Sequence, residues 1–281
     1  MKMLQIFTRM RSSRLAKVPK SLRKLNKRQR FTALTIIVTL GLIATQLINN
    51  VDYYFPVAIT LSLFSGAAAY LVFSTDFVGM RRITAVILLA FFTAAIAFFY
   101  FLLPVRWLTR LPMAMLYAVG YYAILLTENI FNIGTDKTIQ LLRVARSIAL
   151  LITLVALFLL FETVLSLHLN PFYNAVIVLC ISFPLTLHSL WYMKLTNEHS
   201  RRLLFLALLL ALSLAEVSLA LSFWPIKSTM QALLLTTLFY FGVGITQQEL
   251  IERLFPRTLR EFSLVALLVF LLALFTTSWT N

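Results

Sequence analysis

The sequence predicts an all-α polytopic membrane protein, and three observations support this fold class. Sixty per cent of the 281 residues are hydrophobic and only 12% are charged, which gives a mean hydropathy of +0.89. The hydrophobic residues form nine separate runs, and the basic residues gather between alternate runs. A bilayer span needs about 20 apolar residues, and a helix satisfies its own backbone hydrogen bonds in lipid. We therefore expect a transmembrane helical domain over residues 31–281, preceded by a basic cytoplasmic or interfacial segment over residues 1–30.

The N-terminal segment, residues 1–30, contains eleven Lys or Arg residues and no acid. Each basic residue near an anionic leaflet contributes roughly 1 kcal/mol to membrane binding. This pattern predicts contact with anionic lipid headgroups, or simply a tether that keeps the N-terminus in the cytoplasm. Nucleic acid is not an expected partner, because no aromatic-rich basic fold accompanies the charges.

Nine transmembrane helices are expected from the apolar runs. The runs lie at residues 31–48, 55–74, 83–103, 111–128, 147–169, 172–193, 203–223, 229–246 and 262–279. With a cytoplasmic N-terminus, this threading places 22 of the 25 basic residues on the inner side and leaves Arg106, Arg110 and Lys227 outside. Such an asymmetry follows the positive-inside rule. It predicts four in-out-in hairpins and a final helix, with the C-terminus outside, in a prokaryotic-type cytoplasmic (inner) membrane.

The loops between these runs are short and have distinct chemistry on the two sides. Each outer turn has a proline near the start of the returning helix, as at Pro171 and Pro225, where the fixed φ suits a first helical turn. The inner loops hold seven of the ten acids, Glu128 among them, mixed with basic residues. We expect these acids to be solvated or paired charges at the headgroups, each contributing little to stability.

Two glutamates, Glu162 and Glu216, lie inside apolar runs and carry the main functional prediction. Each stands nine residues before an outer proline, so the two helices run in the same direction and place both carboxyl groups at one depth. A charge at that depth costs at least about 2.5 kcal/mol. Ser166 and Ser213 lie on the matching faces and are candidate hydrogen-bond partners. The four residues form either a proton or ion site or neutral packing between helices, and the residues leave both interpretations open.

Three residues within later runs are candidates for helix breaks. Pro184 removes a backbone donor from the sixth run, and Gly242 and Gly244 loosen the eighth at a comparable depth. Paired discontinuities of this kind are typical of transporters, although prolines and glycines are also common in ordinary membrane helices.

Known catalytic and metal motifs are missing from the sequence. It contains no H-E-x-x-H, G-x-S-x-G, Walker loop, C-x-x-C or G-x-G-x-x-G pattern. The three histidines, His168, His188 and His199, are too far apart to share a metal ion and are interpreted as structural. We therefore assign no catalytic, cofactor-binding or metal-binding residue, and we expect no cofactor.

A transporter-like protein for a small solute, an ion or a lipid is the function that these features favour. A non-catalytic membrane scaffold or assembly protein is one alternative, since it needs only the hairpins and the basic segment. The other is a membrane-embedded enzyme acting on a lipid-linked substrate, with Asp52 as an acid on the outer face. An acid in this place is similar to that of polytopic glycosyltransferases that use lipid-linked sugars, and the resemblance covers this one residue. The missing motifs favour a protein that is not an enzyme.

Overall fold

The computed structural model describes residues 26–45, 51–73, 80–102, 107–133, 139–194 and 201–277. These residues form α-helices and one short 3-10 turn, which confirms the all-α prediction. The elements are α2 (Lys27–Ala44), η2 (Val51–Tyr53), α3 (Tyr54–Val72), α4 (Met80–Leu102), α5 (Trp107–Ile133), α6 (Ile139–Ser166), α7 (Pro171–Lys194), α8 (Arg201–Leu221), α9 (Ser228–Leu250) and α10 (Pro256–Thr276). Most of the predicted basic segment, residues 1–25, lies outside the described residues.

Eight of the described helices, α3 to α10, are long and apolar enough to cross a membrane. The remaining one, α2, corresponds to the first expected run but has only 18 residues, and these include the three basic residues Lys27, Arg28 and Arg30. The chain is therefore a membrane-embedded helical protein, and eight of its nine expected spans have the length and composition that a bilayer requires.

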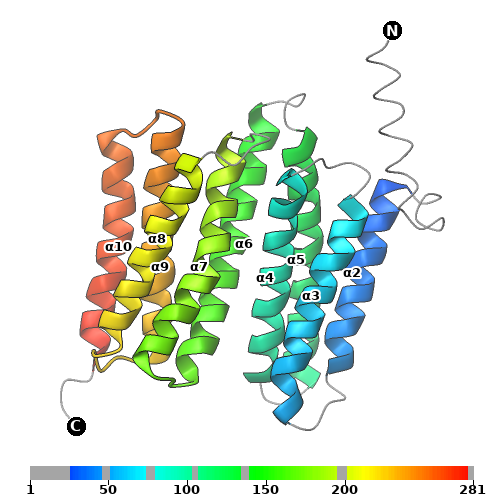
Figure 1. The fold of residues 1–281 in the computed structure, drawn as a ribbon, viewed down its shortest axis with the longest axis horizontal. Helices are drawn as coiled ribbons and strands as arrows, with labels where there is room; N and C mark the ends of the chain where they lie inside the picture. The colour runs from blue at the N-terminus through cyan, green and yellow to red at the C-terminus, as the bar shows by residue number, and fades with distance from the viewer. Residues whose placement is uncertain are drawn as a thin grey trace.

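Consecutive helices run antiparallel, as Figure 1 shows. At one end of the bundle, where α4, α6, α8 and α10 begin, lie most of the described basic residues; we call this the basic end. The other end, at which α7 begins with Pro171 and where Pro225 precedes α9, is called the proline end. The basic end carries Lys27, Arg28, Arg30, Arg82, Arg143, Arg146, Arg201, Arg202, Arg253, Arg257 and Arg260.

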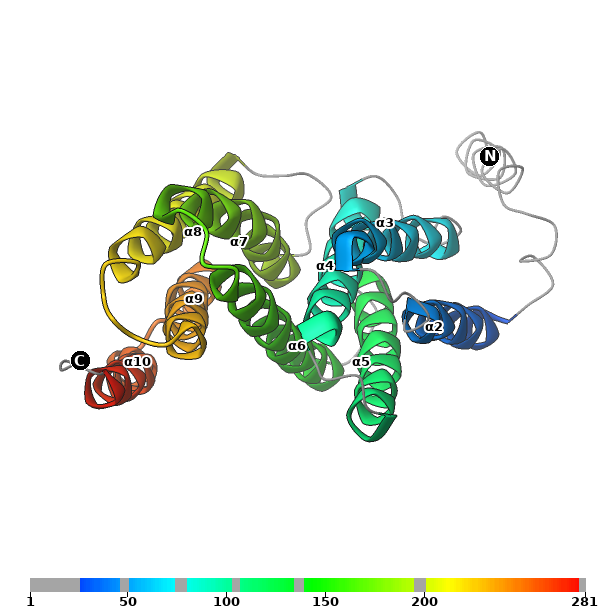
Figure 2. The ribbon, with the colours of Figure 1, turned by 90° about the horizontal axis from the view of Figure 1, so that it is seen from below.

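Helix α6 occupies the middle of the bundle. Seen along the helix axes, α2 to α5 lie on one side of it and α7 to α10 on the other (Figure 2). It packs against α4, α5, α7 and α9. The most extensive interface joins α7 and α8, and both helices have small buried residues, Ser182 and Ser189 on α7 and Ala207 and Ala211 on α8. Small side chains let two helices approach closely, which is how membrane helices associate when lipid removes the hydrophobic driving force.

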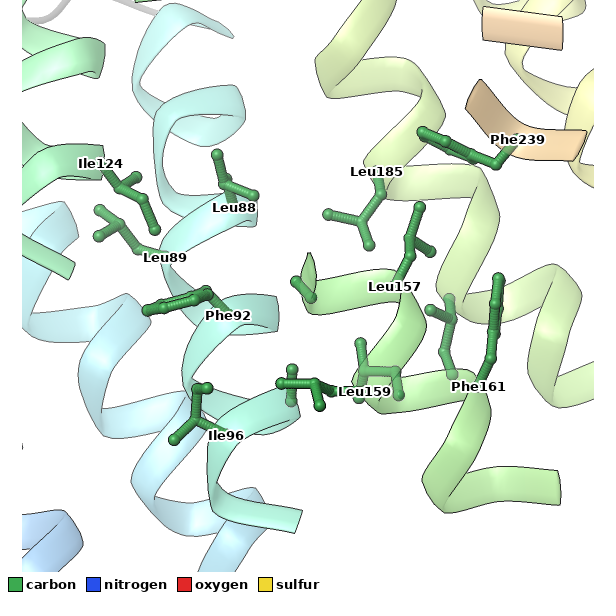
Figure 3. Packing of buried hydrophobic residues seen from close by; sticks show 14 of the residues in the cluster. Leu88, Leu89, Phe92, Ile96, Ile124, Leu157, Leu159, Phe161, Leu185 and Phe239 are labelled. Atoms are coloured by element: carbon green, nitrogen blue, oxygen red, sulfur yellow. The ribbon is translucent and has the colours of Figure 1, made fainter. Parts of the chain in front are cut away.

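The apolar core lies where α6 meets its neighbours on both sides. Figure 3 shows Phe92 and Ile96 of α4 on one side and Leu157 and Leu159 of α6 on the other, with Leu185 of α7 nearby. All five are buried. This packing joins the two halves of the bundle, so that residues on α5 and on α7 are held in fixed positions relative to each other.

Several helices are longer at the basic end than the apolar runs predicted. Helix α5 continues to Ile133, five residues beyond the predicted end at residue 128, and α6 begins at Ile139 rather than at 147. The apolar run marks only the part of a helix that faces lipid, whereas the helix itself continues through polar residues. Glu128 therefore belongs to a helix and not to a solvated loop.

Helices α7 and α9 run without interruption through the three candidate break residues. Pro184 lies inside α7. Gly242 and Gly244 allow close packing in α9, because an added Cβ would lie 3.0 Å from Leu210 Cδ2 at Gly242 and 2.6 Å from Phe262 Cζ at Gly244. Both glycines thus serve contacts of α9 with its neighbours α8 and α10.

Candidate functional site

A fully buried acid–histidine pair joins α5 to α7. The Nε2 atom of His188 lies 2.7 Å from Oε1 of Glu128, and both side chains are 0% exposed. A carboxyl group and an imidazole at this distance share one proton, which lies either on the ring nitrogen or on the carboxyl oxygen. In a membrane protein, an ionisable pair buried between membrane-spanning helices is a candidate functional site, because a charge there is expensive to keep.

The sequence positions this pair through the spacing of buried residues on two helices. On α5, Tyr117, Tyr121 and Glu128 follow at intervals of four and seven residues, which places them on one face, and all three are 0% exposed. On α7, His188 and Tyr192 are one turn apart. Glu128 lies five residues before the end of α5 and His188 six before the end of α7, or about 8–9 Å from the basic end at 1.5 Å per residue.

Aromatic and amide groups surround the pair. The ring of Tyr192 lies edge-on to His188, with centroids 5.6 Å apart, and stacks on Phe131 at 5.1 Å. Gln247 of α9 donates from Nε2 to the hydroxyl of Tyr192 and to the carbonyl of Ser189, both at 2.9 Å. These contacts lock α7 between α5 and α9 at the depth of the pair.

Helix α6 contributes a cation nearer the basic end. The Nη2 atom of Arg146 donates to the carbonyl of Met193 at 3.1 Å, one residue beyond Tyr192. Arg146 thus lies beside the last turn of α7, where carbonyl groups without helical partners favour a positive charge. Four helices, α5, α6, α7 and α9, therefore meet around the pair.

The pair retains unused hydrogen-bonding capacity. Among the described residues, neither Oε2 of Glu128 nor Nδ1 of His188 has a hydrogen-bond partner. Buried polar atoms are nearly always satisfied, so two orphaned atoms on one pair are unusual. Oε2 is an acceptor without a partner in the described part of the chain, and Nδ1 is a donor or an acceptor according to the tautomer, so each could hydrogen-bond to a further group.

A second polar cluster lies about two turns further along α5, toward the proline end. The Thr93 hydroxyl lies 2.9 Å from Ser65 Oγ, 2.8 Å from the carbonyl of Leu89 and 2.9 Å from the hydroxyl of Tyr117, and it can donate its one proton to one of them. Ser65 donates to the hydroxyl of Tyr121 at 3.0 Å. Each of the four hydroxyl groups has a partner, so this cluster, unlike the pair, fixes α3, α4 and α5 together without leaving an orphaned group.

The two glutamates predicted from the sequence lie at the proline end on different helices. Oε1 of Glu162, on α6, accepts a hydrogen bond from Thr229 of α9 at 3.1 Å, whereas Glu216, on α8, is exposed. The structure records no hydrogen bond between these two described carboxyl groups. The candidate partners bond within their own helices, Ser166 to the carbonyl of Thr163 at 2.9 Å and Ser213 to that of Leu209 at 3.0 Å.

The remaining predicted residues are dispersed. Asp52 is exposed in η2 at the proline end, while Arg110, which was expected outside with it, is buried 5.2 Å over the ring of Tyr100. Within the described ranges, no group of three or more His, Cys, Asp or Glu side chains is arranged to hold a metal ion.

Glu128 was expected to be a solvated or paired charge in an inner loop; it is paired, but within α5 and fully buried, so the loop position was wrong and sequence reasoning missed the site that it forms. The apolar run ends at Glu128, which made the residue look like a loop position. The signal that would have found it is the shared face with Tyr117 and Tyr121 on α5. His188 was interpreted as structural because the three histidines cannot share a metal ion, and its partner Glu128 is 60 residues away in the sequence.

Residues 86–276 match a protein family described as "Protein of unknown function (DUF5656)". The match covers more than half of the chain and includes both Glu128 and His188. No curated protein and no solved structure matches the chain. By this match from α4 to the end of α10, the chain belongs to the DUF5656 family.

Proposed function

We propose that this protein is a proton-coupled membrane transporter for a small solute, an ion or a lipid, and that the Glu128–His188 pair is its proton-binding group. A single observation carries the proposal. The side chains of Glu128 and His188 lie 2.7 Å apart, and both are completely buried among the helices of a membrane-embedded bundle. Intramembrane carboxyl and imidazole groups typically mark proton relays and transport pathways.

Burial explains how the pair would couple protons to a change of shape. With one shared proton the pair has no net charge, which is the form that a dry environment favours. Adding a second proton leaves a net positive charge, and removing the shared proton leaves a net negative charge. Either event is favourable only in a state in which water reaches the pair. Protonation therefore shifts the equilibrium between a closed and a hydrated state, which is the requirement for coupled transport.

The carboxyl groups at the proline end belong to the same proposal in a secondary role. Glu162 is the stronger candidate of the two, because its bond to Thr229 joins α6 to α9 and its Oε2 has no partner among the described residues. Glu216 is exposed on α8 and is proposed only as a second titrating group.

We also propose that the basic end faces the cytoplasm and that the membrane is the cytoplasmic one. The charge distribution supports this orientation, since Arg110 and Lys227 are the described basic residues at the proline end. The test is thiol labelling of intact cells in a Cys180→Ser background. A cysteine at Arg253 should resist an impermeant reagent until the cells are opened, whereas a cysteine at Lys227 should react at once. The reverse result would invert the orientation.

The proton-binding role is tested first without any solute. Infrared difference spectra of the reconstituted protein, recorded across a pH change, should contain a carboxyl band that disappears in Glu128→Gln and shifts in His188→Asn. The control, Glu216→Gln, should keep this band. A spectrum without a pH-driven band that depends on Glu128 would refute the assignment.

Flux is tested separately in vesicles loaded with a pH-sensitive dye. A pH gradient imposed across vesicles containing the wild-type protein should collapse faster than in Glu128→Gln vesicles, once a panel of amino acids, sugars and monovalent cations is supplied in turn. The same measurement on Glu162→Gln vesicles shows how much the carboxyl group at the proline end contributes to collapse of the gradient. Equal gradient collapse in wild-type and Glu128→Gln vesicles for every solute would contradict proton coupling, even if the infrared band depends on Glu128.

A further inference from the structure

A second feature of the molecule is an apolar cleft of about 630 Å³ near the proline end. It is formed by α3, α4, α6 and α7, at the place where the two halves of the bundle face each other. A hollow of this size is within the range of small-molecule sites, which are usually lined by hydrophobic side chains. None of the residues of the Glu128–His188 pair lines it.

The cleft has a buried floor and an exposed rim. Leu160 and Val164 of α6 and Ile181 of α7 form the floor, and each is less than 9% exposed. On the rim, Phe55 is 48% and Leu167 38% exposed. The cleft is therefore open at the lipid-facing surface while its walls reach into the core of the bundle.

The depth of the cleft corresponds to one leaflet. Its outer residues, Phe55 and Leu169, lie at the helix ends, beside the starts of α3 and α7. Its deepest residues are Phe91, eleven residues before the end of α4, and Ile181, ten residues after the start of α7. At 1.5 Å per residue this is about 15 Å, or half of a hydrocarbon core about 30 Å thick.

The lining accepts only a hydrocarbon. Thr163 is the one polar residue that lines the cleft, and its hydroxyl donates to the carbonyl of Leu159 at 2.8 Å within its own helix. No polar group of the described lining is thus left to be satisfied by a polar ligand. An apolar chain gains about 0.8 kcal/mol per buried CH₂ when it leaves water, but in a bilayer its preference for the cleft comes from close packing against the walls.

Polar groups stand at the mouth, at the level where a lipid headgroup would lie. Asp52 precedes Phe55 by one turn, and His168 lies between the rim residues Leu167 and Leu169. His168 has a positive φ of 49°, at the end of α6, and its Nδ1 lies 2.8 Å from the Ser166 carbonyl. Since a carbonyl only accepts, Nδ1 carries a proton and Nε2 is the nitrogen left for another partner.

We propose that this cleft binds one acyl chain of a glycerophospholipid from the leaflet at the proline end, with its headgroup at the level of Asp52 and His168. The one-leaflet depth selects an acyl chain over the much longer chain of a polyprenyl carrier. This site is separate from the proton-binding pair and does not depend on the proposed transport activity.

The molecule contains its own control for ordinary lipid contact. A hollow of about 500 Å³ on α10 is lined by residues of that helix alone, including Leu264, Leu268 and Phe275, and so it is an open surface rather than a built site. Lipid there exchanges with the bulk bilayer. Lipid in the four-helix cleft is expected to be retained.

The experiment uses the full-length protein in vesicles that contain a phosphatidylglycerol with a photoactivatable group midway along one acyl chain. After irradiation, labelled peptides are mapped by mass spectrometry. Labelling of residues 160–167 and 177–181 should survive a chase with excess unlabelled phosphatidylglycerol for at least tenfold longer than labelling of residues 264–275.

Ala94→Phe places a ring in the cleft from α4, and it should reduce cleft labelling at least tenfold while α10 labelling is unchanged. Ala67→Phe adds the same ring at an exposed position on α3 outside the cleft and should have no effect. If Ala94→Phe fails to insert, Ile181→Trp fills the same cleft from α7. Unchanged cleft labelling in the folded variants, or equal exchange at the cleft and at α10, would overturn the proposal. Displacement by a polyprenyl phosphate but not by phosphatidylglycerol would overturn the choice of an acyl chain.

Discussion

The strength of the Glu128–His188 contact distinguishes a charged pair from a neutral hydrogen bond, and a double-mutant cycle measures it. The variants are Glu128→Leu, His188→Leu and the double variant, each of which replaces a polar side chain by an apolar one. Both partners are 0% exposed, so solvent does not screen the interaction. Removing one member of a buried ion pair costs about 3–5 kcal/mol, because the other is left as an uncompensated charge, whereas replacing both is often close to neutral.

A neutral pair would behave differently. Interhelical hydrogen bonds between uncharged groups in a membrane contribute about 0.6 kcal/mol on average and about 1.7 at most. With the proton on the imidazole we expect a coupling energy of about 3 kcal/mol or more, and with the proton on the carboxyl group no more than about 1.7 kcal/mol. The assay is reversible unfolding in bicelles, carried out on all four proteins. Its readout is the concentration, at the unfolding midpoint, of denaturant or of a reagent that traps the unfolded state.

The hydroxyl cluster supplies the matched control. Ser65 and Thr93 are buried, uncharged and 2.9 Å apart, so the cycle built from Ser65→Ala and Thr93→Val reports a neutral contact in the same protein. Their coupling energy should not exceed about 1.7 kcal/mol. A Glu128–His188 coupling energy no larger than that of Ser65 and Thr93 would refute the ionised pair and with it the reasoning about buried charge.

Three further predictions concern other parts of the chain. Gly244→Ala should destabilise the docking of α10 by about 1–3 kcal/mol, because the new Cβ would overlap the ring of Phe262, and Phe262→Leu should restore thermal stability; absence of rescue would contradict the packing argument. Thr229→Val should cost only about 0.6 kcal/mol in bicelle unfolding, since it removes one hydrogen bond from Glu162, and a loss above 2 kcal/mol would mean that this carboxyl is charged. A peptide of residues 1–30 should bind anionic vesicles and dissociate as salt rises; equal binding to zwitterionic vesicles would exclude the electrostatic mechanism.

The fold was predictable because its determinants are local. An apolar run of membrane length specifies a helix. A proline in the first turn, as at Pro171 and Pro256, marks where the next helix begins after a loop. The helix ends were less predictable, since Glu128 and the residues after it are polar and yet helical. Hydropathy reports the environment of a segment rather than its backbone conformation.

The candidate site was not predictable because it depends on which helices meet. Glu162 and Glu216 have equivalent positions in two hairpins, and α6 and α8 both pack against α9, but Glu216 is on an exposed face of α8, so only Glu162 reaches a partner on α9. Glu128 and His188 have no such repeat in the sequence, and their contact arises from the packing of α5, α6 and α7 around one another. An equal depth in the membrane is a weaker predictor of proximity than a shared buried face.

The position of Glu128 near the end of α5 bears on how the protein is made. His188 follows 60 residues later, and at a synthesis rate of about 5–20 residues per second it emerges about 3–12 s after its partner. Until then the carboxyl group has no imidazole to pair with. Because it lies only about 8 Å from the basic end, a small shift of α5 along its axis returns it to water while the ribosome completes α6 and α7. The acid can therefore pair with His188 only after α7 has been made, and a translational pause after α7 should favour correct pairing.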